Sequence, residues 1–379
     1  IYANGSLWIH SVSAGEVIAA KAVAPHLSQA FTEMPLIAST TTETGQAAAQ
    51  RTLTEAKEIF YYPFDFSWNV EKFLRRYRPK IIVLLEAEIW PNFINAAAEF
   101  GTKIFLVNGR ISERTFHRYQ KFGAVMAGPL RRITAFCMQT EQDAERLRQT
   151  IDGDGRIFVT GNCKFDVDFP TLTTDQKNQW KTKLGLSDAA PVLVVGSTHP
   201  GEEEIVLQAF EQVRAQYPHA AMVLAPRHPE RFNAVAELLG RRGIAYARAS
   251  EAEQGNLSPK PVVLFDVMGQ LARAYGLGDL AIVGGSFVPI GGHNLLEANA
   301  HTIPVVFGPY MNRQPDILRL VGEQGGGMQC ASEALGATVI DLLNNQERAQ
   351  AMAQRGRECI DENRGSALKC VEIIKEFYK

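Results

Sequence analysis

Short apolar runs alternate with longer stretches of helical periodicity along the whole chain. This alternation is typical of parallel α/β folds, in which each buried strand is followed by a helix. Helical patterns cover, for example, residues 203–217 and 231–241, and residues 347–379 predict helices without a further strand. The predicted strands are residues 7–12, 36–39, 81–85, 103–107, 135–138, 156–160, 191–196, 221–225, 262–265, 280–283 and 305–307.

A polar segment at residues 166–174, which contains Pro170, separates two such series of strands and helices. The chain has 379 residues, and at roughly 100–200 residues per domain this length also favours two domains. We predict an α/β protein with two Rossmann-like domains, residues 1–168 and 169–350, that face a central cleft. Residues 351–379 are expected to form a helical tail that packs back on the first domain.

The charge distribution gives no sign of nucleic-acid binding, because the formal net charge is only −2. Between Arg51 and Arg132, however, 14 lysines and arginines stand against 8 acidic residues. This excess indicates either solvated helix faces or a surface that meets anionic lipid. No apolar run is long enough to predict a membrane-spanning helix. Five cysteines without a pairing pattern favour reduced thiols and a cytosolic compartment.

Polar side chains follow the predicted strands of the first half. Glu16 comes after the first strand, near the start of the next helix, where it is either a capping residue or a general base for a substrate hydroxyl. Thr41 and Thr42 belong to a hydroxyl-rich segment after the second strand, which has more hydroxyls than a single helix cap needs. These groups can donate hydrogen bonds to sugar or phosphate oxygens.

Two carboxylates, Glu86 and Glu88, directly follow the third strand. Alternation along an extended segment would place both on the same side, and a buried pair is costly without partners. We therefore expect them to be solvated or functional. Arg110 follows the fourth strand, and Lys164 lies just before the predicted domain boundary, where it could face either domain.

In the second half, Ser197 and His199 follow one strand, and Arg227 follows the next between two prolines. An arginine held in this way suits phosphate recognition, although it can also occupy an ordinary surface turn. The strongest pattern is the glycine-rich segment 284–286 followed by residues 291–297, with a helix expected to start near Asn294. Backbone N–H groups and the helix dipole at such a start can bind one phosphate, and Glu297 can accept from ribose hydroxyls.

Several familiar site motifs are absent from the sequence. There is no Walker A motif, no zinc spacing and no Gly-x-Ser-x-Gly nucleophile elbow. A Gly-x-Gly-x-x-Ala match at residues 276–281 precedes its strand, so it does not fit dinucleotide binding. Redox and hydrolase functions therefore lose support, and we predict neither a metal site nor a cofactor.

At this point the motifs together resemble one family, the bacterial 3-deoxy-D-manno-octulosonic acid (Kdo) transferases of lipopolysaccharide biosynthesis. A single such motif would be weak, but eight in the same order along nearly the whole chain are specific. They are residues 10–16 (HSVSAGE), 40–45 (TTTETG), 86–92 (EAEIWPN), 108–110 (NGR), 161–166 (GNCKFD), 196–199 (GSTH), 226–229 (PRHP) and 291–297 (GGHNLLE).

The resemblance implies a GT-B glycosyltransferase fold with an acceptor-binding first domain and a donor-binding second domain. It implies CMP-Kdo as the donor and a lipid A precursor, lipid IVA, as the acceptor, with metal-independent direct displacement. It also implies a location on the cytoplasmic side of the cell inner membrane, peripheral or anchored, against an anionic lipid surface and not a nucleic acid.

The resemblance further implies roles for individual residues. Glu16 matches the family's general base, and Glu86 and Lys164 match positions that support the transition state. Gln270 stands where the family commonly has an acidic residue, which puts a charge-based role there in doubt. The positions that match contacts to CMP are Pro226, Arg227, Val267, Met268, Gly269, Asn294, Leu295, Leu296 and Glu297. The remaining candidates for the acceptor site or the cleft are Ser13, Thr41, Thr42, Glu88, Arg110, Ser197 and His199.

Two alternatives are compatible with the residues. One is another nucleotide-sugar enzyme of the same fold, such as a UDP-sugar transferase or epimerase. The other is a non-catalytic binding protein with two domains. The unpaired cysteines and the carboxylates at the strand ends of the first half fit the second alternative poorly.

Overall fold

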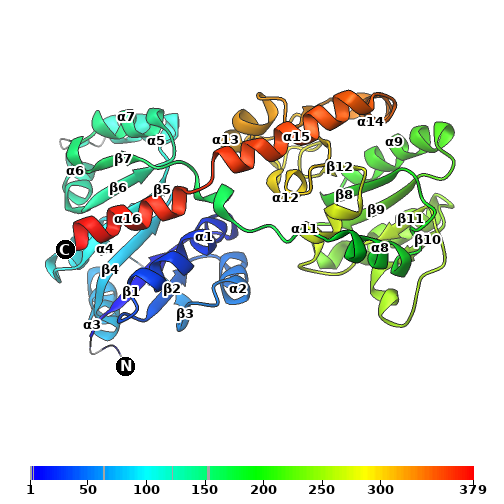
Figure 1. The fold of residues 1–379 in the computed structure, drawn as a ribbon. Helices are drawn as coiled ribbons and strands as arrows, with labels where there is room; N and C mark the ends of the chain where they lie inside the picture. Colours follow the sequence, from blue (N-terminus) through cyan, green and yellow to red (C-terminus); the bar gives the residue numbers. More distant parts are fainter. Residues whose placement is uncertain (1, 3, 63–64, 122, 152–153) are drawn as a thin grey trace. The chain divides into compact units, whose positions relative to one another are not determined.

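The computed structural model describes residues 2, 4–62, 65–121, 123–151 and 154–379. The chain divides into two compact units (Figure 1). Unit 1 comprises Ile1–Asp168 together with Asn363–Lys379, and unit 2 comprises Phe169–Glu362. Each unit is built around its own sheet of seven parallel strands.

The sheet of unit 1 has the strand order β3-β2-β1-β4-β5-β6-β7. The order reverses between β1 and β4, which is the switch point where doubly wound folds place their ligands. Its strands are β1 Ser6–His10, β2 Leu36–Thr40, β3 Glu58–Tyr61, β4 Pro79–Leu85, β5 Lys103–Gly109, β6 Ala135–Met138 and β7 Ile157–Val159. Its helices are α1 Ala14–Ala30, α2 Glu43–Thr52, α3 Ser67–Tyr77, α4 Pro91–Glu99, α5 Glu113–Lys121, α6 Gly123–Arg132, α7 Glu141–Arg148 and α16 Ser366–Tyr378.

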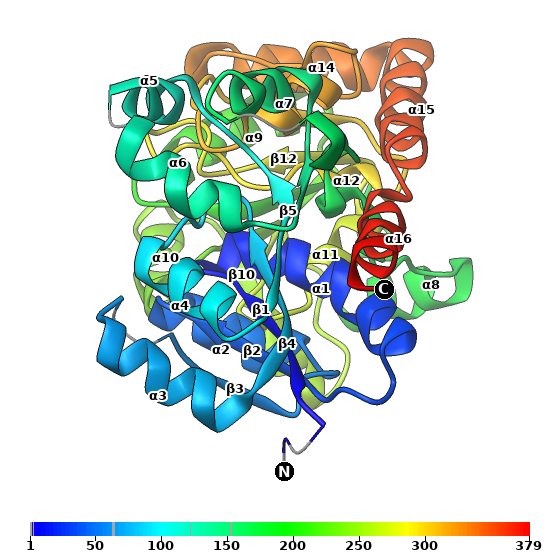
Figure 2. The same cartoon turned by 90° about the vertical axis from the view of Figure 1, so that its left-hand side faces the viewer.

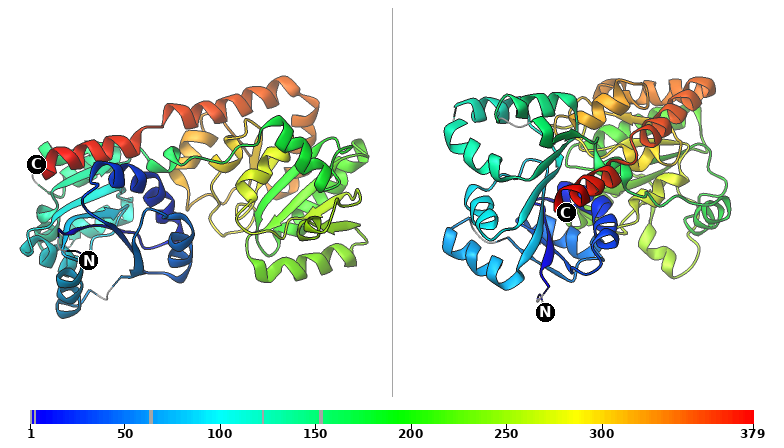
Figure 3. Two further views of the ribbon diagram at one scale, coloured as in Figure 1. Left: turned by 60° about the horizontal axis from the view of Figure 1, so that its bottom comes forward. Right: turned by 60° about the vertical axis from the view of Figure 1, so that its left-hand side comes forward.

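Helices cover both faces of this sheet (Figure 3). Helix α1 contacts α2 and α16 in one layer, and α4 contacts α3 and α6 in the other. Because both faces are covered, the central strands are buried on both sides and read as continuous apolar runs. Trp8 on β1 is fully buried, and its indole N–H donates to Ser39 Oγ at 2.7 Å.

The sheet of unit 2 has the order β10-β11-β9-β8-β12-β13-β14, with its switch point between β8 and β12. Its strands are β8 Val192–Thr198, β9 Ala221–Pro226, β10 Tyr246–Arg248, β11 Val262–Leu264, β12 Leu280–Val283, β13 Val305–Phe307 and β14 Met328–Gln329. Its helices are α8 Thr174–Lys183, α9 Glu202–Gln216, α10 Phe232–Arg241, α11 Leu271–Ala274, α12 Leu296–Asn299, α13 Pro315–Ile317, α14 Leu335–Asn344 and α15 Gln346–Glu362.

All eleven predicted strands are present, but three further strands, β3, β10 and β14, were not predicted. Each is the last strand at one edge of its sheet and is only partly buried. An edge strand needs fewer apolar side chains than a central one, so a search for apolar runs passes over it.

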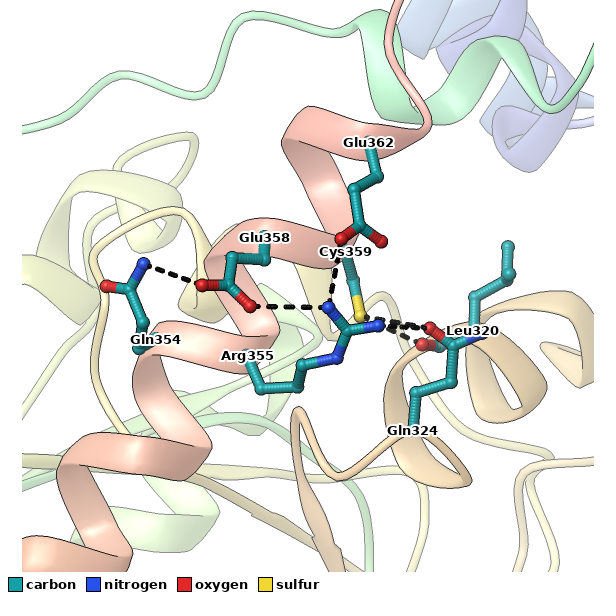
Figure 4. Close-up of polar contacts among 7 residues, drawn as sticks. All are labelled: Leu320, Gln324, Gln354, Arg355, Glu358, Cys359 and Glu362. Atoms are coloured by element: carbon teal, nitrogen blue, oxygen red, sulfur yellow. Dashed lines mark hydrogen bonds and ion pairs between the residues drawn. The ribbon is translucent and has the colours of Figure 1, made fainter.

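The segment predicted as a single helical tail, residues 351–379, is divided between the two units. Helix α15 belongs to unit 2, where Arg355 bonds to Gln324 and to Glu362 at 3.0 Å each, and the Cys359 thiol donates to Leu320 O (Figure 4). Helix α16 belongs to unit 1 and lies beside α1 (Figures 1 and 2). Within unit 1, the Asp166 carboxylate accepts the backbone N–H groups of Gly365 and Ala367 at the start of α16.

Among the residues described, no helix is both long enough and apolar enough to cross a lipid bilayer.

Candidate active site

The carboxylate of Glu16 lies at the switch point of unit 1, in the first turn of α1. It folds back over its own turn: Glu16 Oε2 accepts from Val12 N at 2.5 Å, and Glu16 Oε1 accepts from Ser13 Oγ at 3.2 Å. Only 8% of the residue is exposed. Ser13, one of the predicted cleft residues, therefore orients the carboxylate.

The pKa of Glu16 is raised to about 7, mainly by burial and also by the negative charges of Glu88 and Glu86, against the lowering effect of the hydrogen bonds from Val12 and Ser13. A helix start favours an ionised carboxylate, but burial outweighs that effect at Glu16. A carboxyl with a pKa near 7 is close to the optimum for a general base at neutral pH. These effects of charge also show that three of the predicted carboxylates, Glu16, Glu86 and Glu88, form one cluster.

Glu86 forms an ion pair with Lys164, with 2.6 Å between Oε1 and Nζ. Both side chains are largely buried, at 18% and 16% exposure. Strand β4 ends at Leu85, and Glu86 has a φ of 56°, so the segment is not extended and simple alternation does not explain its direction. Glu88 points to a different partner, because its Oε2 accepts from the indole N–H of Trp90 at 2.9 Å.

A set of buried amides fixes the backbone around Lys164. Asn162 Oδ1 accepts from Lys164 N at 3.0 Å, and Asn108 Oδ1 accepts from Cys163 N at 2.9 Å. The amide of Gln139 donates to Asn108 O and accepts from Asn162 Nδ2. Sequence reasoning did not assign this positioning role. The sequence signal for this role was an asparagine, Asn108, at the end of a predicted strand. In the structure Asn108 has a φ of 55°, a conformation in which asparagine is enriched.

Thr42 is a structural residue. Its Oγ1 accepts from Gly45 N, which caps α2, and donates to Val12 O at 3.0 Å. Gly45 allows this approach, since a Cβ there would lie 2.7 Å from Val12 O. Thr41, the residue before Thr42, is exposed. Arg110, another of the predicted residues, contacts the segment after β4, because its backbone N–H donates to Glu86 O at 3.3 Å.

At the switch point of unit 2, the buried carboxylate of Glu202 holds two loops together. It accepts from the backbone N–H groups of His199 at 2.9 Å, Gly285 at 2.6 Å, Ser286 at 3.0 Å and Phe287 at 2.8 Å. The N–H groups of this glycine-rich loop therefore bind a protein carboxylate. The sequence showed Glu202 only as one of three glutamates that open a helix.

The helix expected to start near Asn294 instead begins at Leu296 and has four residues. Asn294 Oδ1 accepts from Leu296 N at 3.0 Å, which satisfies one N–H of that start. So short a helix has a small dipole, which would contribute little to phosphate binding, and the phosphate site expected here stays a prediction. Leu295 and Leu296 are fully buried, so their side chains belong to the core.

The other predicted donor residues surround the same edge of the sheet. Pro226 is the buried last residue of β9, and Arg227 after it is exposed. Met268 is 44% exposed after β11, and Gly269 has a φ of 78°. Val267 and Glu297 are partly buried, and the charge of Glu297 contributes to a raised pKa of Tyr275. Ser197, with a φ of 59°, is almost fully buried.

Two histidine rings meet head to head in this region. His199 Nε2 and His293 Nε2 are 2.8 Å apart, and the rings are nearly coplanar, with an interplanar angle of 10°. The pKa of His199 is lowered to about 4 and that of His293 to about 3, mainly by burial and also by the charges of Arg227, His228 and Arg313. Both rings are therefore neutral near pH 7. In the part of the chain that the structure describes, no three His, Cys, Asp or Glu side chains are placed to hold a metal ion.

The chain matches a family model described as 3-deoxy-D-manno-octulosonic-acid transferase (kdotransferase) over residues 2–167. It is 33% identical to the 3-deoxy-D-manno-octulosonic acid transferase of Haemophilus influenzae, over 98% of this chain and 87% of that protein. It is 32% identical to the transferase of the same name from Bordetella pertussis, again over 98% and 87%. The structure of a UDP-GlcNAc 2-epimerase from Neisseria meningitidis, bound to UDP-GlcNAc, covers 98% of this chain and all of its own at 14% identity, with a TM-score of 0.65. That likeness shows the fold, which is the GT-B type.

Proposed function

The chain belongs to the 3-deoxy-D-manno-octulosonic acid transferase family of glycosyltransferases in lipopolysaccharide biosynthesis, and we propose that it moves Kdo from CMP-Kdo to the lipid A precursor lipid IVA. The observation that carries the proposal is the carboxylate cluster of unit 1. Glu16 is buried with a pKa of about 7, and the charges of Glu86 and Glu88 act on it. This cluster has the chemistry of a general base, and it lies at the switch point where such folds bind substrates.

Glu16 removes the proton from an acceptor hydroxyl as that oxygen attacks the anomeric carbon of Kdo. The bond between this carbon and the phosphate oxygen breaks, and CMP leaves with the electron pair. The Glu86–Lys164 ion pair supports the charge that develops in the transition state, and the amides that fix Lys164 keep the pair in place. Base catalysis of this kind contributes about 10²–10⁴-fold.

Unit 2 holds the donor. Arg227 binds the phosphate and stabilises it as it leaves, so the displacement needs no metal ion. The exposed side chain of Met268 packs against the nucleobase of CMP, and Glu297 accepts hydrogen bonds from the ribose hydroxyls. Pro226, Val267, Gly269 and the backbone at Asn294 complete the contacts to CMP.

The direct test is product analysis by mass spectrometry with lipid IVA and CMP-Kdo, together with the release of CMP. The expected product is lipid IVA with one or more Kdo residues, and the mass gives their number. Calorimetry with CMP and with UDP tests the alternative that the structural likeness to a UDP-GlcNAc epimerase suggests. Tight binding of UDP with no transfer from CMP-Kdo would refute the proposal.

We also propose that unit 1 meets the anionic surface of the inner membrane from the cytoplasmic side. Two surfaces support this. The basic stretch 110–132 includes the exposed residues Arg114 and Arg118, although Tyr119 within it is buried. At the start of α3, the rings of Phe66 and Trp68 are stacked, and the two residues are 60% and 73% exposed, as expected of aromatic residues at a lipid interface.

Sedimentation with phosphatidylglycerol vesicles tests this. The R114E/R118E variant and the W68S variant should each bind more weakly, because one reverses charges worth about 1 kcal/mol each near such a surface and the other removes an aromatic contact. R241E, which changes an exposed arginine of unit 2, is the control. Unchanged binding of both unit 1 variants would leave these surfaces as ordinary solvated faces.

A further inference from the structure

The His199–His293 pair presents unused hydrogen-bonding atoms. One Nε2 must donate and the other accept across their 2.8 Å contact. When both rings are neutral, the ring whose Nε2 accepts carries its one N–H proton on Nδ1, and the ring whose Nε2 donates has a free lone pair on Nδ1. Within the described residues, neither Nδ1 has a protein partner. The pair is thus a neutral group with one open donor and one open acceptor.

The pair is held in place by buried contacts. The Glu202 carboxylate binds both the backbone of His199 and the Gly285 loop. The ring of His293 rests directly on Gly285, where a Cβ would lie 2.6 Å from His293 Cδ2. The site therefore exists before a ligand binds, which reduces the entropic cost of binding.

Two arginines approach the pair from opposite loops. Arg227 belongs to the loop beside His199, since its N–H donates to Thr198 O at 3.0 Å. Arg313 belongs to the loop beside His293, since its N–H donates to Gly291 O at 2.9 Å. The side chain of Arg313 covers Gly291, where a Cβ would lie 2.5 Å from its Cγ. Both guanidinium groups lie close enough for their charge to act on both rings.

The nearby carboxylates do not neutralise these two charges. Glu203 is fully buried and pairs with Arg231 at 2.6 Å, and Glu202 is occupied by backbone N–H groups. Neither Arg227 nor Arg313 has an ion-pair partner in the described part of the chain, and both are exposed. An anionic ligand with two negative groups would satisfy them.

We infer that Arg313 and the His199–His293 pair bind the carboxylate of the donor sugar, while Arg227 binds the phosphate. This inference rests on the proposed function. In CMP-Kdo, the carbon that carries the phosphate also carries the carboxylate, so the two anions are only a few bonds apart. Arg227 and Arg313, whose charges both act on this one pair of rings, can take two such anions. The carboxylate site makes the protein select acidic sugars over neutral ones.

Calorimetry without acceptor tests the inference, with CMP and CMP-Kdo as the two ligands. The R313Q substitution keeps methylene groups over Gly291 and removes the charge. In this variant the affinity for CMP-Kdo should fall about 10–100-fold, as expected for the loss of a charged hydrogen bond, while the affinity for CMP stays within about twofold. R313K should recover part of the loss. R241Q, which removes an exposed arginine at the end of α10, should bind both ligands like the parent protein.

An equal loss for CMP and CMP-Kdo in R313Q would overturn the inference, because Arg313 would then bind the phosphate. Unchanged binding of both ligands would overturn it as well. These results differ from a failure of the proposed function. If the proposed function is wrong, the parent protein itself would not bind CMP-Kdo, and the inferred carboxylate site would then be wrong as well.

Discussion

Replacing Glu16 by glutamine should remove transfer activity and, at neutral pH, stabilise the folded protein. The two effects have one cause, the burial of a carboxylate that must ionise to act. Its pKa rises from 4.5 to about 7 on folding. Between these values the folded protein binds the proton more tightly than the unfolded chain does, so stability falls as the pH rises through this window.

The pKa shift corresponds to about 3 kcal/mol of lost stability above pH 7 and to none below about pH 4.5. A neutral glutamine amide has no such cost, and it can still accept from Val12 N and donate to Ser13 Oγ. We therefore expect the Glu16→Gln variant to melt about 6–12 °C above the parent protein at pH 8, with most of this gain lost at pH 5. Transfer should fall by about 10²–10⁴-fold, while the affinity for CMP is unchanged.

Thermal unfolding followed by circular dichroism at pH 5 and pH 8, combined with a CMP-release assay, measures both effects. Glu43→Gln is the matched control, because Glu43 occupies the first turn of α2 but is exposed. It should change neither quantity. A stability difference that is the same at both pH values would refute burial as the cause of the pKa shift. Activity within about tenfold of the parent protein would refute Glu16 as the base.

Four further single variants and one double variant test the surroundings. Glu88→Gln removes a charge that raises the pKa of Glu16, so the acidic limb of the pH–rate profile should move to lower pH; an unmoved limb would contradict the coupling. Lys164→Met and Glu86→Gln should each lower the rate of single-turnover transfer at least about 100-fold. Because the two residues act as a unit, the double variant should be no slower than the slower of the two single variants. Additive losses would contradict this. Glu202→Gln should lower the melting temperature, because charged hydrogen bonds contribute about 1.5–3 kcal/mol. It should also weaken CMP binding in calorimetry. If both measurements match the parent protein, Glu202 does not hold the loops.

The sequence predicted the central strands well because their burial on both faces requires apolar residues in unbroken runs. β12 and β13, for example, begin and end where the pattern placed them. The edge strands β3, β10 and β14 were missed because their residues are mixed, and their pairing depends on a neighbouring strand. The short helix α12 was predicted too early, because Asn294 looks like a helix cap but bonds to Leu296 N outside a longer helix.

The positions of the candidate site followed from the sequence, because parallel strands bring their polar ends to one edge of a sheet. Glu16, Glu86 and Arg227 could be named in this way, and Lys164 was named from its place just before the predicted domain boundary. Their electrostatics could not, since a pKa depends on burial and on charges that the fold brings together. Only the tertiary structure shows that burial raises the pKa of Glu16 and that Glu86 forms an ion pair with Lys164. It alone also shows that Glu202 occupies the glycine-loop N–H groups, because these contacts join segments that are far apart in the chain.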